Sequence, residues 1–529
     1  MDRLMDTLWK TGASRCVSPV LVTGVTALII FFNGGIGIGF YNHVGILLLV
    51  RRSLNANYLP GDFSLSVWLY HHRQFVELIA GLARIMGEDR AVIVLSVLST
   101  LALSAALLCL CRALRLPLAA YCVVGLFVAV SVGWTGHGFE ENTFVGDREI
   151  SPTNLAHACV LLAVASWLTE RYRLTAFCAG LTVFFHLQIG VIFALVFALF
   201  YAAQLKRFRV YELLSFAALF LMPAFFPLWD LWQMTQRGLL GASYSLQFVN
   251  FRFLHHFELE SAASAAWVGA HVLVQLAAYW WLRRTGKPES RQVGVLLMIS
   301  LVLTAFSLAH FADYYLLRTT TIIRLQFLRV SPFISLFGTL ALVTALNAWA
   351  EEGAGRAERR KVRSFLVYAC LFLAIGTQLL HASTSGRPDY SLRVKRYVDE
   401  PSRWIEICRW IDVHGPAGAV YLAPPGNEGF AYLANRSTVV EYKIAPDGGQ
   451  YLNEWFERLR DLAGGTLPDA PGWDNVALLN QAYSRLRSEQ LVALGKKYGA
   501  GYAVLPQSSM ATLDVVYRNS EYRLVRLTE

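Results

Sequence analysis

The chain contains a succession of apolar segments, each long enough to cross a lipid bilayer. A transmembrane helix needs about 20 mostly apolar residues, and such segments recur from residue 18 to residue 381. Hydrophobic residues make up 55% of the chain and charged residues only 16%, too apolar a composition for one soluble core. The sequence therefore predicts a polytopic α-helical membrane protein. We expect about eleven transmembrane helices, over residues 18–40, 91–113, 117–135, 152–170, 173–187, 188–205, 210–229, 264–283, 291–311, 330–349 and 363–381.

Two of the expected crossings are short. Residues 173–187 and 188–205 meet at a turn that contains His186. This pair forms either two crossings or one tilted or re-entrant hairpin. The first apolar segment follows a basic stretch with no evident small-residue cleavage site, so we expect it to remain in the protein as a signal anchor.

Lysine and arginine residues concentrate in alternate connections between the expected crossings. Cytoplasmic loops carry such an excess, so the N-terminus is predicted to be cytoplasmic. The net charge of +10 follows from this topology. Because the basic residues are spread over five short loops instead of forming one patch, we expect no nucleic-acid partner. These residues are Arg112 and Arg115; Arg171 and Arg173; Lys206, Arg207 and Arg209; Arg283, Arg284, Lys287 and Arg291; Arg356, Arg359, Arg360, Lys361 and Arg363.

The same topology places five segments on the outer side of the membrane: 41–90, 136–151, 230–263, 312–329 and the C-terminus from about 382. The first is too long for a plain connector. Its 71–86 stretch alternates apolar and polar residues at helical spacing, which predicts an amphipathic helix. Such a helix either lies in the membrane interface or packs against other loops.

A change in composition near residue 381 predicts two domains, a transmembrane domain over 1–381, including the 41–90 loop, and a soluble extracytoplasmic α/β domain over 382–529. In the second domain we expect helices over 404–413, 451–462 and 488–498. We expect strands over 419–422, 438–442, 503–506 and 522–527, with a turn at 424–426.

The outer segments carry polar side chains suited to group transfer. A general base must remove a proton from an acceptor hydroxyl, and fixed cations must hold an anionic leaving group such as a phosphate. Arginine suits phosphate because its planar guanidinium donates two parallel hydrogen bonds. Asp62, in the sequence Tyr58–Asp62, is the candidate base. The candidate clamp is Arg252, His255, His256, Arg324 and Arg329, and His43, Glu140, Glu141 and Asp147 lie on the same side of the membrane.

Each candidate also has a structural interpretation. An aspartate after a glycine, as in Gly61–Asp62, is most often a turn or a helix cap. The Glu140/Glu141 pair fits a solvated loop, and His255–His256 fits the headgroup level. Arg324 and Arg329 fit an interface position. The spacing of these residues in the sequence does not choose between the functional and the structural interpretations.

Several features of the chain occur together. They are the N-terminal anchor, the long first outer loop with Asp62, the acidic second loop before a proline-initiated span at Ser151–Ala156, about eleven spans and the terminal α/β domain. In this architecture the whole chain resembles the GT-C superfamily of integral-membrane glycosyltransferases. The turn Phe184–Gly190 and the run Trp404–Ile411, with Pro424–Pro425 and Gly429–Phe430 through Arg436, resemble stretches of a poorly characterised bacterial branch of it.

The resemblance implies an inverting enzyme that takes a sugar from a polyprenyl-phosphate or polyprenyl-diphosphate donor. The acceptor is a lipid, glycan or protein on the outer face of the membrane. Asp62 matches the first-loop acid regarded as the base, and Glu140, Glu141 or Asp147 matches a second acid that assists or binds metal in some members. Basic residues of later loops hold the lipid phosphate. The residue before Asp62 is Gly61, so the first loop lacks an adjacent pair of acids that could bind a metal. The resemblance therefore leaves open whether the enzyme needs a divalent cation, magnesium or manganese, as a cofactor.

The resemblance also implies a bacterial inner membrane, with the C-terminal domain in the periplasm. One rival interpretation is a transporter or flippase for lipid-linked intermediates, but the sequence has no inverted repeat or matched broken helices to favour it. Another is a non-catalytic scaffold of a cell-envelope complex, whose C-terminal domain binds a partner.

Overall fold

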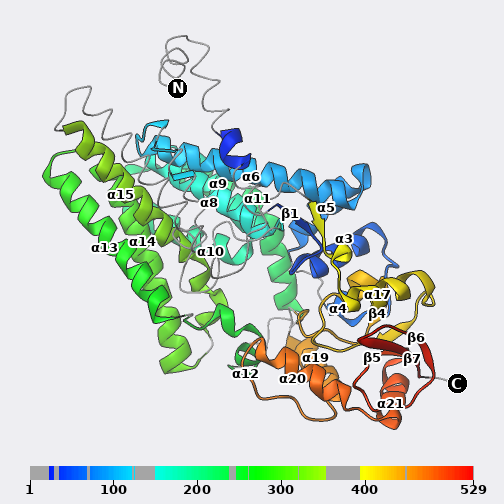
Figure 1. Ribbon diagram of the computed structural model, residues 1–529. Helices are drawn as coiled ribbons and strands as arrows, with labels where there is room; N and C mark the ends of the chain where they lie inside the picture. The colour runs from blue at the N-terminus through cyan, green and yellow to red at the C-terminus, as the bar shows by residue number, and fades with distance from the viewer. Residues whose placement is uncertain are drawn as a thin grey trace. The chain divides into compact units, whose positions relative to one another are not determined.

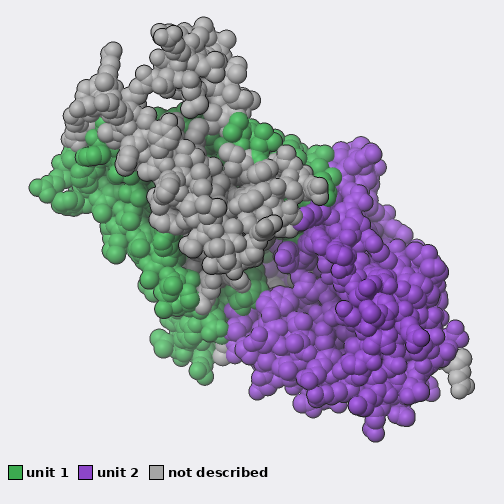
Figure 2. Space-filling model, viewed as in Figure 1, with its two compact units in different colours: residues 1–36, 93–226, 255–394 green, residues 37–92, 227–254, 395–529 purple. Residues whose placement is uncertain are grey.

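The computed structural model describes residues 23–28, 35–67, 72–118, 120–121, 124–125, 149–237, 246–259, 261–319, 321–352, 394–446 and 449–527. The chain divides into two compact units, which Figure 2 distinguishes by colour. Unit 1 comprises residues 1–36, 93–226 and 255–394. Unit 2 comprises residues 37–92, 227–254 and 395–529.

Among the described residues, five helical stretches are long and apolar enough to cross a membrane. They are α6 (Glu88–Ala113), α11 (Val210–Gln236), α13 (Ala262–Arg284), α14 (Ser290–Phe311) continuing into η4 (Ala312–Leu317), and η6 (Phe327–Val330) leading into α15 (Pro332–Glu352). The protein is therefore a mainly helical, polytopic membrane protein, as predicted. The predicted crossings 18–40, 117–135 and 363–381 lie wholly or largely outside the described residues, so the count of eleven stays a prediction.

Unit 1 also contains three shorter apolar helices: α8 (Pro152–Leu168), α9 (Tyr172–Phe185) and α10 (Leu187–Ala203). The predicted break between the two short crossings is confirmed, since α9 ends and α10 begins on either side of His186. In Figure 1, α13, α14 and α15 run alongside one another. α8 packs against α9, and α9 packs against α10.

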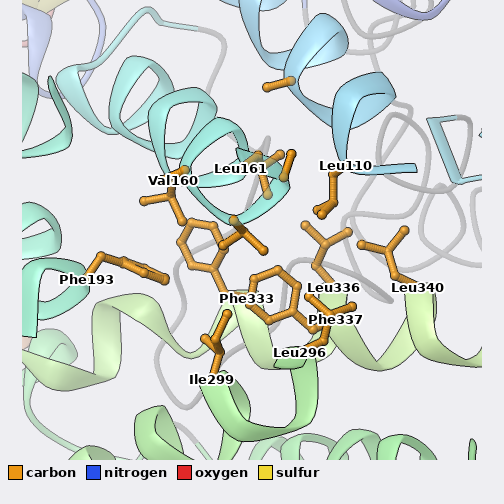
Figure 3. Packing of buried hydrophobic residues seen from close by; sticks show 14 of the residues in the cluster. Leu110, Val160, Leu161, Phe193, Leu296, Ile299, Phe333, Leu336, Phe337 and Leu340 are labelled. Carbon is orange, nitrogen blue, oxygen red and sulfur yellow. The ribbon is translucent and has the colours of Figure 1, made fainter. Parts of the chain in front are cut away.

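The core of unit 1 joins helices that are far apart in the sequence. Figure 3 shows Leu110 of α6, Leu161 of α8, Phe193 of α10, Leu296 of α14 and Phe333 of α15 in one buried cluster. In the close-up the rings and branched side chains of these helices converge on one another. This shared core fixes the ends of α10, α14 and α15 relative to each other.

Glycines allow α9 to approach its neighbours closely. A Cβ atom on Gly190 of α10 would lie 2.3 Å from the Cα of Val183, and one on Gly180 of α9 would lie 2.2 Å from the carbonyl oxygen of Phe220. Small residues permit such close backbone contact between membrane helices. The α9–α10 hairpin is thus held tightly, with His186 at its turn.

Unit 2 contains a mixed sheet built by the C-terminal region. Its strand order is β4 (Ser437–Thr438), β3 (Val420–Leu422), β5 (Ala500–Pro506), β7 (Tyr522–Arg526) and β6 (Val515–Arg518). The first three strands are parallel, and β7 runs antiparallel to both β5 and β6. The helices are α17 (Arg403–His414), α18 (Phe430–Ala434), α19 (Gly449–Leu462), α20 (Asp474–Ser484) and α21 (Ser488–Tyr498). The C-terminal region is therefore α/β, as predicted.

Two earlier segments of the chain supply side chains to the core of unit 2. Phe63, in α4 (Phe63–Val67), and Phe251, in the short helical turn η2 (Val249–Phe253), are buried in the same cluster as Trp455. Residues 41–90, which are predicted to belong to the transmembrane domain, thus share a compact unit with residues 395–529. The predicted boundary near residue 381 lies outside the described residues.

The predicted amphipathic helix is present as α5 (Arg73–Met86). Its apolar residues Phe75, Val76, Ile79 and Ala83 are buried. It packs against α3 (His43–Leu54). The apolar face of α5 therefore has a protein partner, as the second interpretation of this stretch expects. β1 (Ile36–Ile38) precedes α3 and pairs with β2 (Val394–Arg396).

Candidate functional site

Arg329 meets two histidines that come from other parts of unit 1. Nη2 of Arg329 lies 2.9 Å from Nε2 of His256, and Nη1 lies 3.4 Å from Nε2 of His186. The rings of His255 and His256 are 3.9 Å apart between centroids. Arg329 and His256 were predicted as members of one phosphate clamp, and the structure brings them together. We refer to Arg329, His186 and His256 as the Arg329 cluster.

Short, tight turns present these three side chains. His186 is the N-cap of α10, and its Nδ1 faces the backbone N–H of Ile189 at 3.4 Å. His256 closes the 3₁₀ turn η3 (Leu254–His256), and Arg329 lies in the 3₁₀ turn η6. His186 thus lies at the end of an apolar helix and Arg329 lies directly before one, where a polar group can leave the hydrophobic layer, whereas His256 lies in the segment that precedes α13.

Proton positions in the Arg329 cluster follow from its contacts. An arginine side chain can only donate, so Nε2 of His256 accepts, and neutral His256 then carries its proton on Nδ1. His186 faces one N–H through each ring nitrogen, yet a neutral imidazole accepts at only one of them. An anionic oxygen within reach of Nη1 of Arg329 and a protonated Nε2 of His186 would accept a hydrogen bond from each. The cluster is therefore suited chemically to an anion.

The other predicted cations have different surroundings. Arg324, in η5 (Ile323–Leu325), is exposed. Arg252 is 5% exposed in unit 2, where its guanidinium donates to the carbonyl oxygens of Tyr442 at 3.1 Å and Lys443 at 2.8 Å. Its guanidinium carbon also lies 4.4 Å from the centroid of Trp473. Arg252 thus serves the packing of unit 2, and burial lowers its pKa to about 10.

The predicted base, Asp62, is a buried carboxylate in unit 2. It is 1% exposed, its Oδ1 accepts from the N–H of Leu65 at 3.1 Å, and its Oδ2 accepts from the N–H of Thr438 at 3.0 Å. The first contact caps α4, and the second satisfies an N–H of β4, the edge strand of the sheet. A Cβ atom on Gly61 would lie 3.0 Å from Val420, so the loop fits closely against β3. These contacts explain Asp62 as a structural residue.

Burial raises the pKa of Asp62 to about 6, although hydrogen bonds from the Thr438 and Leu65 backbone act in the opposite direction. A pKa near neutrality suits a general base. However, both oxygens already accept from backbone amides, and the carboxylate is shielded from solvent. Its role as base stays a prediction. His43, at the start of α3, is fully buried.

A second buried carboxylate, Glu441, was not predicted as a site residue. It is 2% exposed, and it accepts from the N–H groups of Gly429 at 2.9 Å and Ala431 at 3.1 Å at the start of α18. Burial raises its pKa to about 7, and the charge of Asp62 adds to the shift. Glu441 lies in the stretch interpreted as a strand from Thr438 to Tyr442, where no sequence signal marks a helix cap.

The remaining predicted acids, Glu140, Glu141 and Asp147, lie outside the described residues. In the part of the chain that the structure describes, no group of three or more His, Cys, Asp or Glu residues is arranged to hold a metal ion. His186 was noted in the sequence only as part of a turn. His186 lies between two apolar segments, on the side of the membrane predicted for the other candidate residues. That position could have indicated it as a site residue.

Comparison with known proteins finds a similar fold among solved structures. Residues 402–462 match a domain of unknown function (DUF6798). No curated protein matches the sequence. Among solved structures, ArnT from Cupriavidus metallidurans in the apo state is similar, with a TM-score of 0.51 and 11% identity, over 98% of this chain and 99% of that one. ArnT is a GT-C glycosyltransferase. The predicted resemblance is thus confirmed at the level of the fold, because this chain shares the fold of ArnT over almost its whole length.

Proposed function

We propose that this protein is a membrane glycosyltransferase that moves a sugar from a polyprenyl-phosphate donor to an acceptor hydroxyl on the periplasmic face of a bacterial inner membrane. The observation that carries the proposal is the Arg329 cluster. It gathers a guanidinium and two imidazoles in a chain that shares the fold of ArnT, a GT-C glycosyltransferase. Those groups are the kinds that hold a phosphate.

In the proposed reaction the acceptor hydroxyl oxygen attacks the anomeric carbon of the sugar. A base takes the hydroxyl proton, the bond between the anomeric carbon and the phosphate oxygen breaks, and polyprenyl phosphate leaves with the bonding electrons. Negative charge grows on the departing phosphate, so cations placed there stabilise the transition state more than the ground state. Arg329 supplies a permanent positive charge, and His186 supplies a donor through a protonated Nε2.

The resemblance to GT-C enzymes names Asp62 as the base. Within its present contacts, an acceptor hydroxyl would reach Asp62 only after the 58–62 loop leaves the N–H of Thr438. Asp62→Asn preserves the size of the side chain and removes the base. Transfer by the correctly folded variant is therefore expected to fall by roughly 10² to 10⁴. Near-wild-type transfer would remove Asp62 from the mechanism, and an outer-loop acid such as Glu140 or Glu141 would take its place in the proposal.

The test of the proposed function uses the purified full-length protein in detergent. It is incubated with tritiated decaprenyl-phosphate-linked hexoses and pentoses and with periplasmic lipid and glycan acceptors. We expect sugar transfer by the wild-type protein and its loss in Arg329→Ala, with partial retention in Arg329→Lys, which keeps the charge. Movement of an intact lipid-linked sugar across a vesicle membrane, without cleavage, would favour the flippase interpretation. Neither transfer nor movement would favour the scaffold.

The proposed orientation can be tested separately. Cysteines introduced in the C-terminal region and in a basic connection should react with membrane-impermeant maleimide from opposite sides of the membrane. The proposal expects labelling of the C-terminal region in intact spheroplasts. Labelling of the basic connection in intact spheroplasts would instead indicate the opposite orientation in the membrane.

A further inference from the structure

We infer that Asp313 and His310, at the C-terminal end of α14, are positioning residues that set the geometry of the Arg329 cluster. The inference rests on the proposed function, because it concerns the same anion-binding site. Both side chains are completely buried. They lie three residues apart on continuous helical turns, a spacing that places side chains on one face.

Asp313 organises the segment that leads to Arg329. Its Oδ1 accepts from the N–H and the hydroxyl of Thr319, the N–H bond being 3.0 Å long. Its Oδ2 accepts from the N–H groups of Ile322 at 2.6 Å and Ile323 at 3.1 Å. One carboxylate therefore accepts from four donors of the segment between η4 and η6. Charge-assisted hydrogen bonds of this kind are about twice as strong as neutral ones.

A sequence of backbone hydrogen bonds links this turn to Arg329. The N–H of Ile323 donates to Asp313, the N–H of Gln326 donates to the carbonyl of Ile323 at 2.8 Å, and the N–H of Arg329 donates to the carbonyl of Gln326 at 3.1 Å. Each link fixes one short turn of the chain. A displacement of the turn at Asp313 is therefore transmitted to the backbone that carries the guanidinium.

His310 holds the opposite side of the cluster. A carbonyl oxygen can only accept, so Nε2 of His310 donates to the carbonyl of Phe257 at 3.1 Å. The two rings also stack, with centroids 5.9 Å apart and planes 16° from parallel. Phe257 directly follows His256, which contacts Arg329. The end of α14 thus holds both chain segments that meet at the contact between Arg329 and His256.

A purely structural role predicts a different response to mutation than a positioning role does. A positioning residue acts on ligand binding through Arg329, so its effect disappears when Arg329 is removed. A structural residue lowers stability and all ligand affinities independently of Arg329. A double-mutant cycle separates the two because it measures the interaction between the sites.

The experiment measures the affinity of the full-length protein in detergent for farnesyl phosphate, with farnesol as the phosphate-free control. Arg329→Ala should weaken farnesyl phosphate binding by roughly 30-fold or more and leave farnesol binding unchanged. Asp313→Asn replaces one acceptor oxygen by a donor, and it should weaken farnesyl phosphate binding by roughly 10-fold, the size seen when a group that orients a ligand-binding side chain is lost. In the Arg329→Ala background the same change should have less than about a 2-fold effect.

Two milder variants keep the test independent of folding. Thr319→Val removes the hydroxyl that donates to Asp313 and accepts from the N–H of Thr321 at 3.4 Å, and it keeps the backbone N–H bond to Asp313. It should weaken phosphate binding by about 2- to 5-fold. His310→Phe keeps the stacked ring and loses the donor to Phe257, and it should act in the same direction. Both should retain the wild-type melting temperature to within a few degrees.

The outcomes distinguish the inference from the function on which it rests. If the wild-type protein binds farnesyl phosphate no better than farnesol, the proposed function fails and the inference fails with it. If Arg329→Ala weakens phosphate binding while Asp313→Asn and Thr319→Val do not, only the inference is overturned. The same holds if Asp313→Asn has equal effects with and without Arg329, or weakens farnesol binding equally.

Discussion

Two arginines of this chain, Arg329 in unit 1 and Arg252 in unit 2, were predicted to do the same work and have contrasting surroundings. Arg252 is buried and donates to two backbone carbonyls. Arg329 faces the ring nitrogens of two histidines. Backbone carbonyls are fixed by the fold and tie an arginine to it. Imidazoles can gain, lose and redirect a proton near neutral pH, so they can respond to a ligand.

The same contrast applies to the carboxylates of unit 2. In the part of the chain that the structure describes, Asp62 and Glu441 accept hydrogen bonds from backbone N–H groups alone, and each lies buried against the start of a short helix. A residue type suited to chemistry is thus informative only together with its partners. Partners on the backbone indicate a role in holding the fold, whereas clustered ionisable side chains indicate a candidate site.

The largest effect that this comparison predicts is on activity at Arg329. Arg329→Ala removes the cation proposed to face the leaving phosphate, so sugar transfer should fall by roughly 10² to 10³. Initial rates of transfer from a tritiated decaprenyl-phosphate sugar measure the loss. Arg284→Ala is the matched control, because it removes an exposed arginine in the last turn of α13, in a connection that is predicted to be cytoplasmic. Equal losses in both variants would contradict a specific role for Arg329.

Arg252→Ala should show the reverse pattern. Removing the guanidinium leaves the buried carbonyls of Tyr442 and Lys443 without this donor and removes the contact with Trp473. The free energy of unfolding should fall by about 3 kcal/mol. Denaturant unfolding of the full-length protein in detergent measures this change. If the variant is as stable as the wild-type protein and transfers sugar poorly, the contrast between the two arginines is wrong, and Arg252 is again a candidate for binding the phosphate.

Gly190→Ala should loosen the hairpin that carries His186. The new Cβ atom would lie 2.3 Å from the backbone of Val183, so α9 and α10 must move apart. Overpacking of this kind costs about 1–3 kcal/mol. Gly269→Ala in α13 is the control, since its Cβ atom would meet nothing within 4 Å. Thermal unfolding should separate the two variants, and an equal melting temperature would show that the close approach carries no strain.

The smallest effect is a pH dependence of stability in unit 2. Burial raises the pKa values of Asp62 and Glu441 to about 6 and 7, from 3.8 and 4.5. Between about pH 4 and pH 7 the folded protein therefore binds more protons than the unfolded chain, and these two groups make the free energy of unfolding fall as pH rises. Thermal unfolding from pH 5 to 8 should give a flatter profile for Glu441→Gln than for the wild-type protein. A steeper profile would contradict the assignment.

Much of the fold could be predicted because hydrophobic length and period dominate it. The helix over 488–498 was predicted to the residue, and α13 and α14 differ from prediction by two residues or fewer at either end. The helix α20 and the strand β6 were missed. α20 begins Asp474-Asn475 and mixes polar and apolar residues, and β6 is a short, largely exposed strand. Their positions depend on tertiary packing, which no local pattern encodes.

The candidate site could be predicted only in part. Arg329 and His256 were predicted as phosphate-binding residues from their residue types and from their predicted side of the membrane, and the structure places them in contact. Arg252 was grouped with His255 and His256 because it is three residues away in the sequence. Nothing in the sequence indicates that its guanidinium would donate to residues 442 and 443, almost two hundred positions later. The pairing of Asp62 with Thr438 is equally non-local.

The three-part core of unit 2 imposes an order on biosynthesis. Phe63 and Phe251 pack with Trp455, and at 5–20 residues per second the ribosome needs about 20 to 80 s to make the roughly 390 residues between the first and the last. During that interval the apolar face of the first segment has no final partner. A chain that ends early would therefore expose it permanently, so quality-control proteases should recognise truncated products at the segment around Phe63.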